Sequence, residues 1–180
     1  MELCKIQESD HAYLEALLIE AFPPKERPPF PMLLEQTAQG TADFWVIREE
    51  NRSIGLAYLL PFDDIVYLFY FAVDSSCRGK GYGTKAMKAI MEKYEGRHIL
   101  FSIEDWEQEA ENTVQRIKRH EFYLRCGLKD LPFKVQGNGM VFALMSNSDT
   151  VGAEKCRKVM ENIISAASAV ATVHMEIIPR

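Results

Sequence analysis

The pattern of hydrophobic and polar positions predicts a chain in which helices and strands alternate. Apolar residues recur at every third or fourth position over 14–22, 87–94 and 156–167, as on one face of an amphipathic helix. The stretch 65–73 contains no charge and no break, which is typical of a buried strand. Each of these elements has an apolar side to bury, so we expect an α/β fold in which helices pack on a sheet.

Turn residues between the patterned segments give the order of the elements. Asn51-Arg52 and Gly137-Asn138 are short turn signals that each lie between two strand-like segments. The expected strands cover residues 2–6, 43–49, 53–61, 65–73, 98–103, 128–135 and 139–146. The expected helices cover residues 14–22, 32–39, 84–95 and 111–126, with a further helix in the tail. The order up to residue 146 is therefore β-α-α-β-β-β-α-β-α-β-β.

The most specific motif follows the apolar run 65–73. Residues 78–83 read Arg-Gly-Lys-Gly-Tyr-Gly, and a helical pattern begins at Thr84. Glycine lets the backbone come close to a ligand because it has no Cβ, and a helix start presents unpaired N–H groups with a partial positive charge. A strand, a glycine loop and a helix start therefore predict a site for an anionic group, most often a phosphate.

The spacing of the loop excludes two common nucleotide-binding motifs. A P-loop has a lysine directly before the serine or threonine, whereas Lys80 comes earlier and a glycine precedes Thr84. The dinucleotide fingerprint is Gly-x-Gly-x-x-Gly near the start of a βαβ unit, whereas these glycines stand at 79, 81 and 83 in the middle of the chain. An Arg-x-x-Gly-x-Gly pattern remains, with an ordinary glycine turn as the alternative.

This pattern, formed by Arg78, Gly81 and Gly83 after Phe-Ala-Val-Asp, resembles the acyl-CoA-binding motif of the GNAT family of N-acetyltransferases. The order of elements is also similar to that of the GNAT fold. The resemblance implies an α/β (α+β) fold with a mixed, mostly antiparallel central sheet of about seven strands flanked by helices. Residues 1–146 are expected to form the acetyltransferase domain. Residues 147–180 are expected to form an extra C-terminal helical extension, packed on that domain or on a partner subunit in a homodimer.

The same resemblance assigns residues to acetyl-CoA, the expected co-substrate. Phe71, Ala72 and Val73 are expected to offer backbone groups to the pantetheine and the thioester, although their side chains also suit plain core packing. Many members have an asparagine where this chain has Arg116, which could reach a phosphate or an acidic substrate group, or belong to a solvated basic face. The residues expected around the pyrophosphate are Arg78, Gly79, Lys80, Gly81, Tyr82, Gly83 and Thr84.

The expected catalytic groups lie in the second half of the chain. Phe122-Tyr123 resembles the end of a GNAT helix whose tyrosine protonates the leaving thiolate, so Tyr123 is the expected general acid, with core packing as the alternative. The strand 65–73 offers no carboxylate as a general base. Glu104 is the expected base, with a solvated strand end as the other interpretation of this residue. Asp105, His120 or a chain of water molecules are alternative bases.

These expectations lead to an acetyl-CoA-dependent N-acetyltransferase that moves acetyl directly from the thioester to a primary amine of a small molecule or a protein. A non-catalytic acyl-CoA-binding sensor or regulatory module on the same fold is the alternative, because Arg116 replaces the asparagine and strand 65–73 has no carboxylate. A binding protein for another phosphorylated ligand is a third hypothesis.

The segment 22–31 holds five prolines around Lys25, Glu26 and Arg27, so it is expected to be stiff and irregular. Two interpretations remain open: a surface connector, or a wall of the substrate pocket. The loop 104–111 and the hairpin 128–146 are further candidates for the acceptor site.

The composition is that of an ordinary globular protein. Of 180 residues, 47% are hydrophobic and 26% are charged, and the net charge of −5 argues against nucleic acid as the main partner. Four cysteines lie without metal-ligand spacing, so no metal is expected. The N-terminal residues do not resemble a signal peptide, and no apolar run is long enough to cross a membrane. We therefore expect no membrane partner and a cytoplasmic location.

Overall fold

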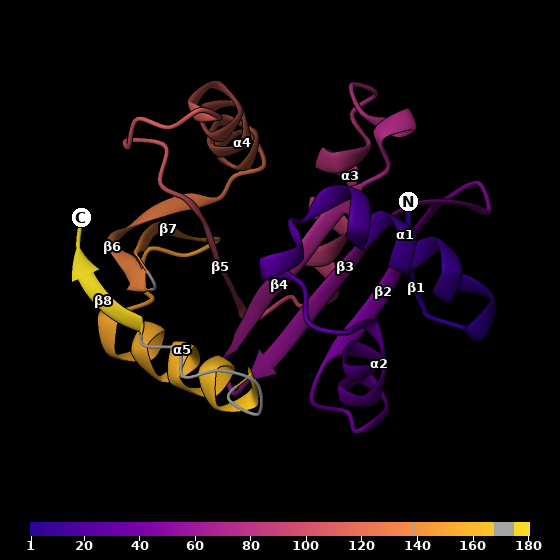
Figure 1. The fold of residues 1–180 in the computed structure, drawn as a ribbon, viewed down its shortest axis with the longest axis horizontal. Helices are drawn as coiled ribbons and strands as arrows, with labels where there is room; N and C mark the ends of the chain where they lie inside the picture. Colours follow the sequence, from indigo (N-terminus) through magenta and orange to yellow (C-terminus); the bar gives the residue numbers. More distant parts are fainter. Residues whose placement is uncertain (138, 168–174) are drawn as a thin grey trace. The chain divides into compact units, whose positions relative to one another are not determined.

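A computed structural model describes residues 1–137, 139–167 and 175–180 (Figure 1). The chain forms two compact units, Met1–Arg97 and His98–Arg180. Four strands lie in each unit, so the described residues hold eight strands, one more than the sequence predicts.

The strands of Met1–Arg97 lie side by side in the order of the sequence. They are β1 (Glu2–Lys5), β2 (Asp43–Glu49), β3 (Arg52–Phe62) and β4 (Ile65–Val73), and each pairs antiparallel with the next. Links as short as those around β3 can join only antiparallel neighbours. The turn after β2 consists of Glu50 and Asn51, both with positive φ. It is not the expected Asn51-Arg52, because Arg52 already pairs with Glu49.

Three helices pack on these strands: α1 (His11–Ala21), α2 (Phe30–Ala38) and α3 (Tyr82–Lys93). Phe44 and Trp45 are successive residues of β2 and therefore point to opposite faces of the sheet. The ring of Phe44 lies 6.1 Å from that of Phe30 in α2. Trp45 Nε1 donates a hydrogen bond of 2.9 Å to the hydroxyl of Tyr94, just after α3. The start of α2 and the end of α3 are thus on opposite faces.

All three helices begin earlier than their apolar patterns predict. The helix α1 begins at His11 rather than at residue 14. The helix α2 begins at Phe30 rather than at residue 32, with Pro31 in its first turn. Proline is tolerated there because a first-turn N–H has no helical partner. The helix α3 begins at Tyr82 rather than Thr84, directly after Gly81.

The unit His98–Arg180 holds strands in the order β5-β7-β6-β8, and each of these neighbouring pairs is antiparallel. Gly137 pairs with Met140 at the end of the β6–β7 hairpin, and Asn138 of the expected turn lies outside the described residues. The elements are β5 (His98–Glu104), α4 (Thr113–Arg125), β6 (Lys129–Gly137), β7 (Met140–Ser146), α5 (Ala153–Ala167) and β8 (Met175–Pro179).

The strand β8 is the element that the sequence does not predict. It has five residues, and it pairs with Phe133–Gly137 of β6. Its partner strand is remote in the sequence, so the pairing that defines β8 is not visible in the local pattern. The tail 147–180 therefore adds a strand as well as the expected helix, α5.

The described residues form a mixed α/β fold with mostly antiparallel strand pairing, helices that flank the strands, and a C-terminal helix. None of the helices in the described ranges is long and apolar enough to span a membrane.

Candidate functional site

The glycine loop folds back on the end of β4. Asp74 accepts hydrogen bonds from the backbone N–H of Ser76, at 2.9 Å, and from its hydroxyl, at 2.7 Å. These two bonds lower the pKa of Asp74. Arg78 Nε donates to the carbonyl oxygen of Val73 at 3.0 Å, and Lys80 Nζ donates to that of Ser76 at 3.0 Å. The loop is therefore held by its own polar groups and by the last residue of β4.

Gly79 and Gly81 have the left-handed conformation, with φ of 75° and 77°. A Cβ at either position meets no atom within 4 Å, so the space above the loop is open. Gly81 is the N-cap of α3, and no side chain caps the helix. The N–H groups of the first turn, from Tyr82 to Thr84, thus begin a helix beside open space. This is the geometry that suits an anionic ligand such as a phosphate.

The end of β4 approaches β3 closely at one point. A Cβ on Gly55 would lie 2.5 Å from the carbonyl oxygen of Ala72, so this position of β3 requires glycine. The pairing of Gly55 with Val73 and of Ala57 with Phe71 fixes the backbone of the last β4 residues. The residues Phe71, Ala72 and Val73 therefore lead directly into the glycine loop from a well-defined strand end.

A cavity of about 310 Å³ lies on the α1–α2 side of this unit. Tyr70 of β4 forms part of its lining, and the Tyr70 hydroxyl donates a short hydrogen bond to the carbonyl oxygen of Glu26. Phe22 packs on the same ring, with 4.6 Å between the centroids. Burial, and next the charge of Glu26, raise the pKa of Tyr70. The proline-rich segment 22–31 is therefore tied to β4 and forms a wall of the cavity.

In the second unit, Tyr123 of α4 is buried. Its ring lies 4.5 Å from that of Phe101 and 5.0 Å from that of Phe122. Burial raises the pKa of Tyr123 to about 12, a change that the nearby charge of Arg119 opposes. Tyr123 thus both packs in the core and keeps a proton that it could donate at neutral pH.

Glu104, at the end of β5, is clamped by three side chains of the loop and helix that follow. Arg116 Nη2 lies 2.9 Å from Oε1, and Arg119 Nη1 lies 3.1 Å from Oε2. Asn112 Nδ2 donates to both oxygens at 3.3 Å, and Arg116 also donates to the backbone oxygen of Asp105. Glu104 and Arg116, expected in separate roles, therefore form one ion pair.

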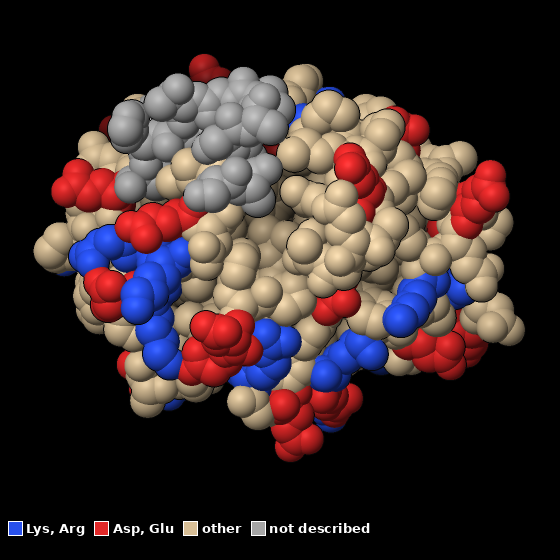
Figure 2. Space-filling model, turned by 90° about the horizontal axis from the view of Figure 1, so that it is seen from below, with Lys and Arg blue, Asp and Glu red and all other residues tan. Residues whose placement is uncertain are grey.

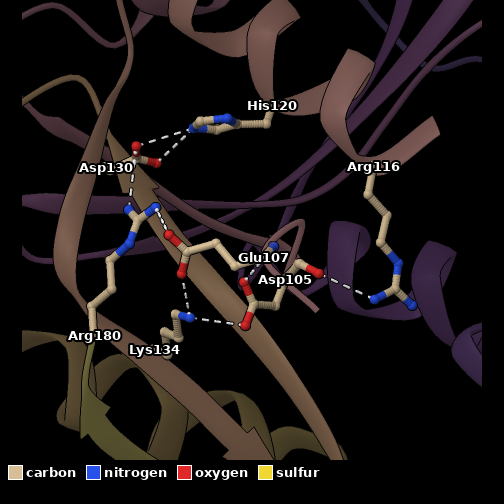
Figure 3. Close-up of polar contacts among 7 residues, drawn as sticks. All are labelled: Asp105, Glu107, Arg116, His120, Asp130, Lys134 and Arg180. Carbon is tan, nitrogen blue, oxygen red and sulfur yellow. Dashed lines mark hydrogen bonds and ion pairs between the residues drawn. The ribbon is translucent and has the colours of Figure 1, made fainter. Parts of the chain in front are cut away.

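The two alternative bases belong to a network of charged side chains (Figure 3). Asp105 is 1% exposed and lies 2.9 Å from Lys134 Nζ. His120 Nε2 lies 3.0 Å from both carboxylate oxygens of Asp130. The His120 ring stacks on Trp106, with 3.4 Å between the centroids.

Arg180 of the tail completes this network. It pairs with Glu107 at 3.1 Å and with Asp130 at 3.2 Å, and its guanidinium lies 4.4 Å from the Trp106 ring centre. Lys134 also pairs with Glu107, at 2.7 Å. No local pattern in the sequence indicates these contacts, because the partners come from a loop, from β6 and from the end of the chain. On the face that Figure 2 shows, Lys and Arg likewise lie among Asp and Glu.

These elements form a mixed α/β fold with a glycine loop between the end of a strand and the start of a helix. A family model for GNAT acetyltransferases matches residues 10–128, so the chain belongs to the GNAT acetyltransferase family. Comparison with curated protein sequences gives no match.

Solved structures share the fold. A protein of Bacteroides thetaiotaomicron, described as a GNAT-family acetyltransferase, aligns with a TM-score of 0.74 and 23% identity over 96% of this chain and 100% of its own. An aminoglycoside 6'-N-acetyltransferase complexed with coenzyme A aligns with a TM-score of 0.64 and 16% identity, over 84% of this chain and 99% of its own. A Bacillus subtilis acetyltransferase in complex with CoA aligns with a TM-score of 0.57 and 17% identity, over 81% of this chain and 95% of its own.

Proposed function

We propose that the protein is an acetyl-CoA-dependent N-acetyltransferase, which moves acetyl directly to a primary amine of a small molecule or a protein. The observation that carries this proposal is the glycine loop, where two left-handed glycines beside open space lead into a helix start that no side chain caps. Family membership supports acetyl transfer as the reaction type. Two solved structures of similar fold hold CoA.

The residues of the first unit suit the phosphates and the pantetheine arm. The N–H groups of residues 78–84 are proposed to donate to the pyrophosphate, and the exposed side chains of Arg78 and Lys80 add positive charge. The backbone of Phe71–Val73 is proposed to pair with the pantetheine amides, as an added strand does.

Arg116 is proposed to contribute a single donor. Its Nη2 is already bonded to Glu104, but its Nε–H is buried and has no acceptor among the described residues. A buried N–H without an acceptor is costly, so this group is available for a ligand atom. An amide oxygen of pantetheine matches this need.

Bound acetyl-CoA supplies an acetyl group that is activated as a thioester. The amine nitrogen forms the new C–N bond while the C–S bond breaks, and the thiolate that leaves takes a proton from Tyr123. With a pKa of about 12, Tyr123 is protonated at neutral pH and has a proton to donate. Glu104 is proposed to accept the amine proton directly or through water, in competition with the bonds that Arg116 and Arg119 already donate to it.

The test combines binding with turnover. Acetyl-CoA, free CoA and ATP are added separately during thermal unfolding, because a ligand that binds only the folded state raises the midpoint. We expect acetyl-CoA to raise it and ATP not to. Release of free thiol from acetyl-CoA is then followed with a panel of primary amines. No rise with saturating acetyl-CoA contradicts the proposal.

One observation favours the non-catalytic alternative, an acyl-CoA-binding sensor. Both oxygens of Glu104 are already occupied, and β4 offers no carboxylate in its place. A sensor is stabilised by acetyl-CoA but releases no thiol with any amine. Thiol release above the rate of hydrolysis excludes it.

A further inference from the structure

An arginine without an ion-pair partner among the described residues lines the cavity beside Tyr70. Arg27 lines the cavity and is half-buried, and its Nε is a buried atom with no hydrogen-bond partner among the described residues. No carboxylate in the described ranges forms an ion pair with it. Arginine is rarely buried without a partner, because loss of hydration must be offset by hydrogen bonds or by an opposite charge.

The position of Arg27 is held by the backbone around it. The hydroxyl of Tyr70 bonds to the carbonyl oxygen of the preceding residue, Glu26. The N–H of Arg27 donates to the carbonyl oxygen of Pro24 at 3.3 Å. The prolines that follow at 28 and 29 restrict the backbone further. Arg27 is therefore presented to the cavity by a stiff segment, so little ordering is needed when a ligand binds.

Apolar side chains also line the cavity. Leu18, Leu33 and Phe30 contribute apolar surface, together with the prolines of the segment. Glu15, an exposed residue of α1, is the acidic side chain in the lining, and no ion pair joins it to Arg27. The volume of about 310 Å³ is at the lower end of the range for small-molecule sites. The lining thus combines apolar side chains with one acidic and one basic side chain, a composition that complements a small zwitterion.

We propose that the acceptor is a small primary amine that carries an anionic group on an apolar body, and that Arg27 binds this anionic group. A carboxylate suits the planar guanidinium, and a phosphate offers the same bidentate chemistry. The carboxylate of Glu15 attracts the ammonium form of the amine. This inference rests on the proposed function, because it assigns the acceptor of the same reaction.

The kinetic test uses amines that differ only in the anionic group. Phenylalanine is compared with phenethylamine, and phosphoethanolamine with ethanolamine, with thiol release as the readout. We expect higher kcat/KM for the anionic member of at least one pair, and the better pair identifies a carboxylate or a phosphate. Arg27→Met is expected to lower that kcat/KM by about 10- to 100-fold, the range for a lost charge-assisted hydrogen bond. The kcat/KM for the amine without the anionic group and the KM for acetyl-CoA are expected to be unaffected.

Controls separate the possible failures. Lys88→Met removes a cation whose side chain is 75% exposed. It should leave kcat/KM unchanged for both members of each amine pair. If Arg27→Met does not fold, Arg27→Lys keeps the charge but loses the bidentate geometry, and it should show a smaller loss. Two results would overturn the inference while the acetyltransferase proposal stands. One is equal kcat/KM for the amines with and without the anionic group. The other is an equal loss of kcat/KM for both members of a pair in the Arg27 variant.

A binding measurement does not depend on turnover. N-acetylphenylalanine and N-acetylphenethylamine are compared as added ligands in thermal unfolding of the whole protein, with the N-acetyl derivatives of the second amine pair alongside. We expect the anionic products to raise the midpoint more, and Arg27→Met to remove that difference. If wild-type protein does not distinguish the products, the inference is wrong. No thermal shift with acetyl-CoA itself is instead the failure of the proposed function.

Discussion

Lys134 Nζ lies 2.9 Å from Oδ2 of Asp105, a carboxylate in a side chain that is only 1% exposed. Burial by itself lowers the pKa of Lys134, but the hydrogen bonds to Glu107 and Asp105 outweigh this effect and raise it. The pair therefore neutralises a buried charge at the start of the loop that follows β5. The same loop carries Trp106 and Glu107, which contact Arg180.

Lys134→Met is expected to lower the free energy of unfolding by about 3 kcal/mol, because it leaves Asp105 buried without its cation. Urea denaturation monitored by tryptophan fluorescence measures the change. Lys129→Met is the matched control, since Lys129 pairs with Asp149 on the surface, where both side chains are more than half exposed. Its cost should stay below about 1 kcal/mol. Equal losses of unfolding free energy in the two variants would show that the buried pair of Lys134 and Asp105 stabilises the protein no more than a surface pair.

Tyr13→Phe is expected to leave stability unchanged or to raise it by up to about 1 kcal/mol. The Tyr13 hydroxyl is buried and has no hydrogen-bond partner among the described residues. Burial, and next the charge of Asp74, raise the pKa of Tyr13. Tyr58→Phe is the opposite case, because the Tyr58 hydroxyl donates to Gln36 Oε1 at 2.7 Å. Loss of this hydrogen bond should lower the free energy of unfolding by about 1 kcal/mol. A larger decrease for Tyr13→Phe than for Tyr58→Phe would contradict the prediction for Tyr13.

Gly81→Ala is expected to lower stability by about 1 kcal/mol and to weaken acetyl-CoA binding by about tenfold or more. The first effect follows from the positive φ, and the second from a methyl group in the open space above the loop. Gly96→Ala, after the other end of α3, introduces the same strain at φ of 83°. It should cost similar stability without a change in affinity. Isothermal titration with acetyl-CoA distinguishes the two variants. An equal loss of affinity in both would contradict a role of the glycine loop in binding.

Tyr123→Phe tests both the chemistry and the burial of the phenol. The hydroxyl group is the proposed proton donor, so kcat is expected to fall by about 100-fold with little change in acetyl-CoA affinity. Unchanged turnover would assign Tyr123 to packing alone.

The pH dependence of stability also depends on Tyr123. Its pKa is about 12 in the folded protein and about 10 in an unfolded chain. Between these values the unfolded chain has lost the proton and the folded protein has kept it, so the contribution of Tyr123 to stability falls as pH rises. Below about pH 10 both states are protonated and this contribution is constant. The free energy of unfolding is measured by urea denaturation across pH 9.5–11.5. It should fall less steeply with pH in Tyr123→Phe than in wild-type protein, by a slope that corresponds to about one proton.

Several elements could be predicted accurately because their signals are local. The expected bounds 43–49 and 65–73 agree with β2 and β4, whose buried residues form nearly continuous apolar runs. The turn before β3 lies one residue earlier than predicted, because Glu50 adopts positive φ although its side chain does not favour this conformation. The strand β8 was missed, because its five residues become a strand only through pairing with β6.

The site could be predicted only in part, for the same reason. The glycine loop is contiguous in the sequence, and its conformation follows from Gly79 and Gly81 themselves. Glu104 and Arg116 were each predicted to face a ligand, and nothing in the sequence indicated that they bond to each other. A helical spacing places Arg116 and Arg119 on one side of α4, but it does not say which carboxylate they meet.

The sequence by itself determined the order of helices and strands from β1 to β7, the glycine loop and the family, because each depends on neighbouring residues and short-range backbone preferences. Only the tertiary structure decided which charges are neutralised. It paired Lys134 with the buried Asp105 and left Arg27 without a described partner at the wall of a cavity. The free energy of a charge depends on burial and on groups brought close by folding, and neither quantity is present in the linear order of residues.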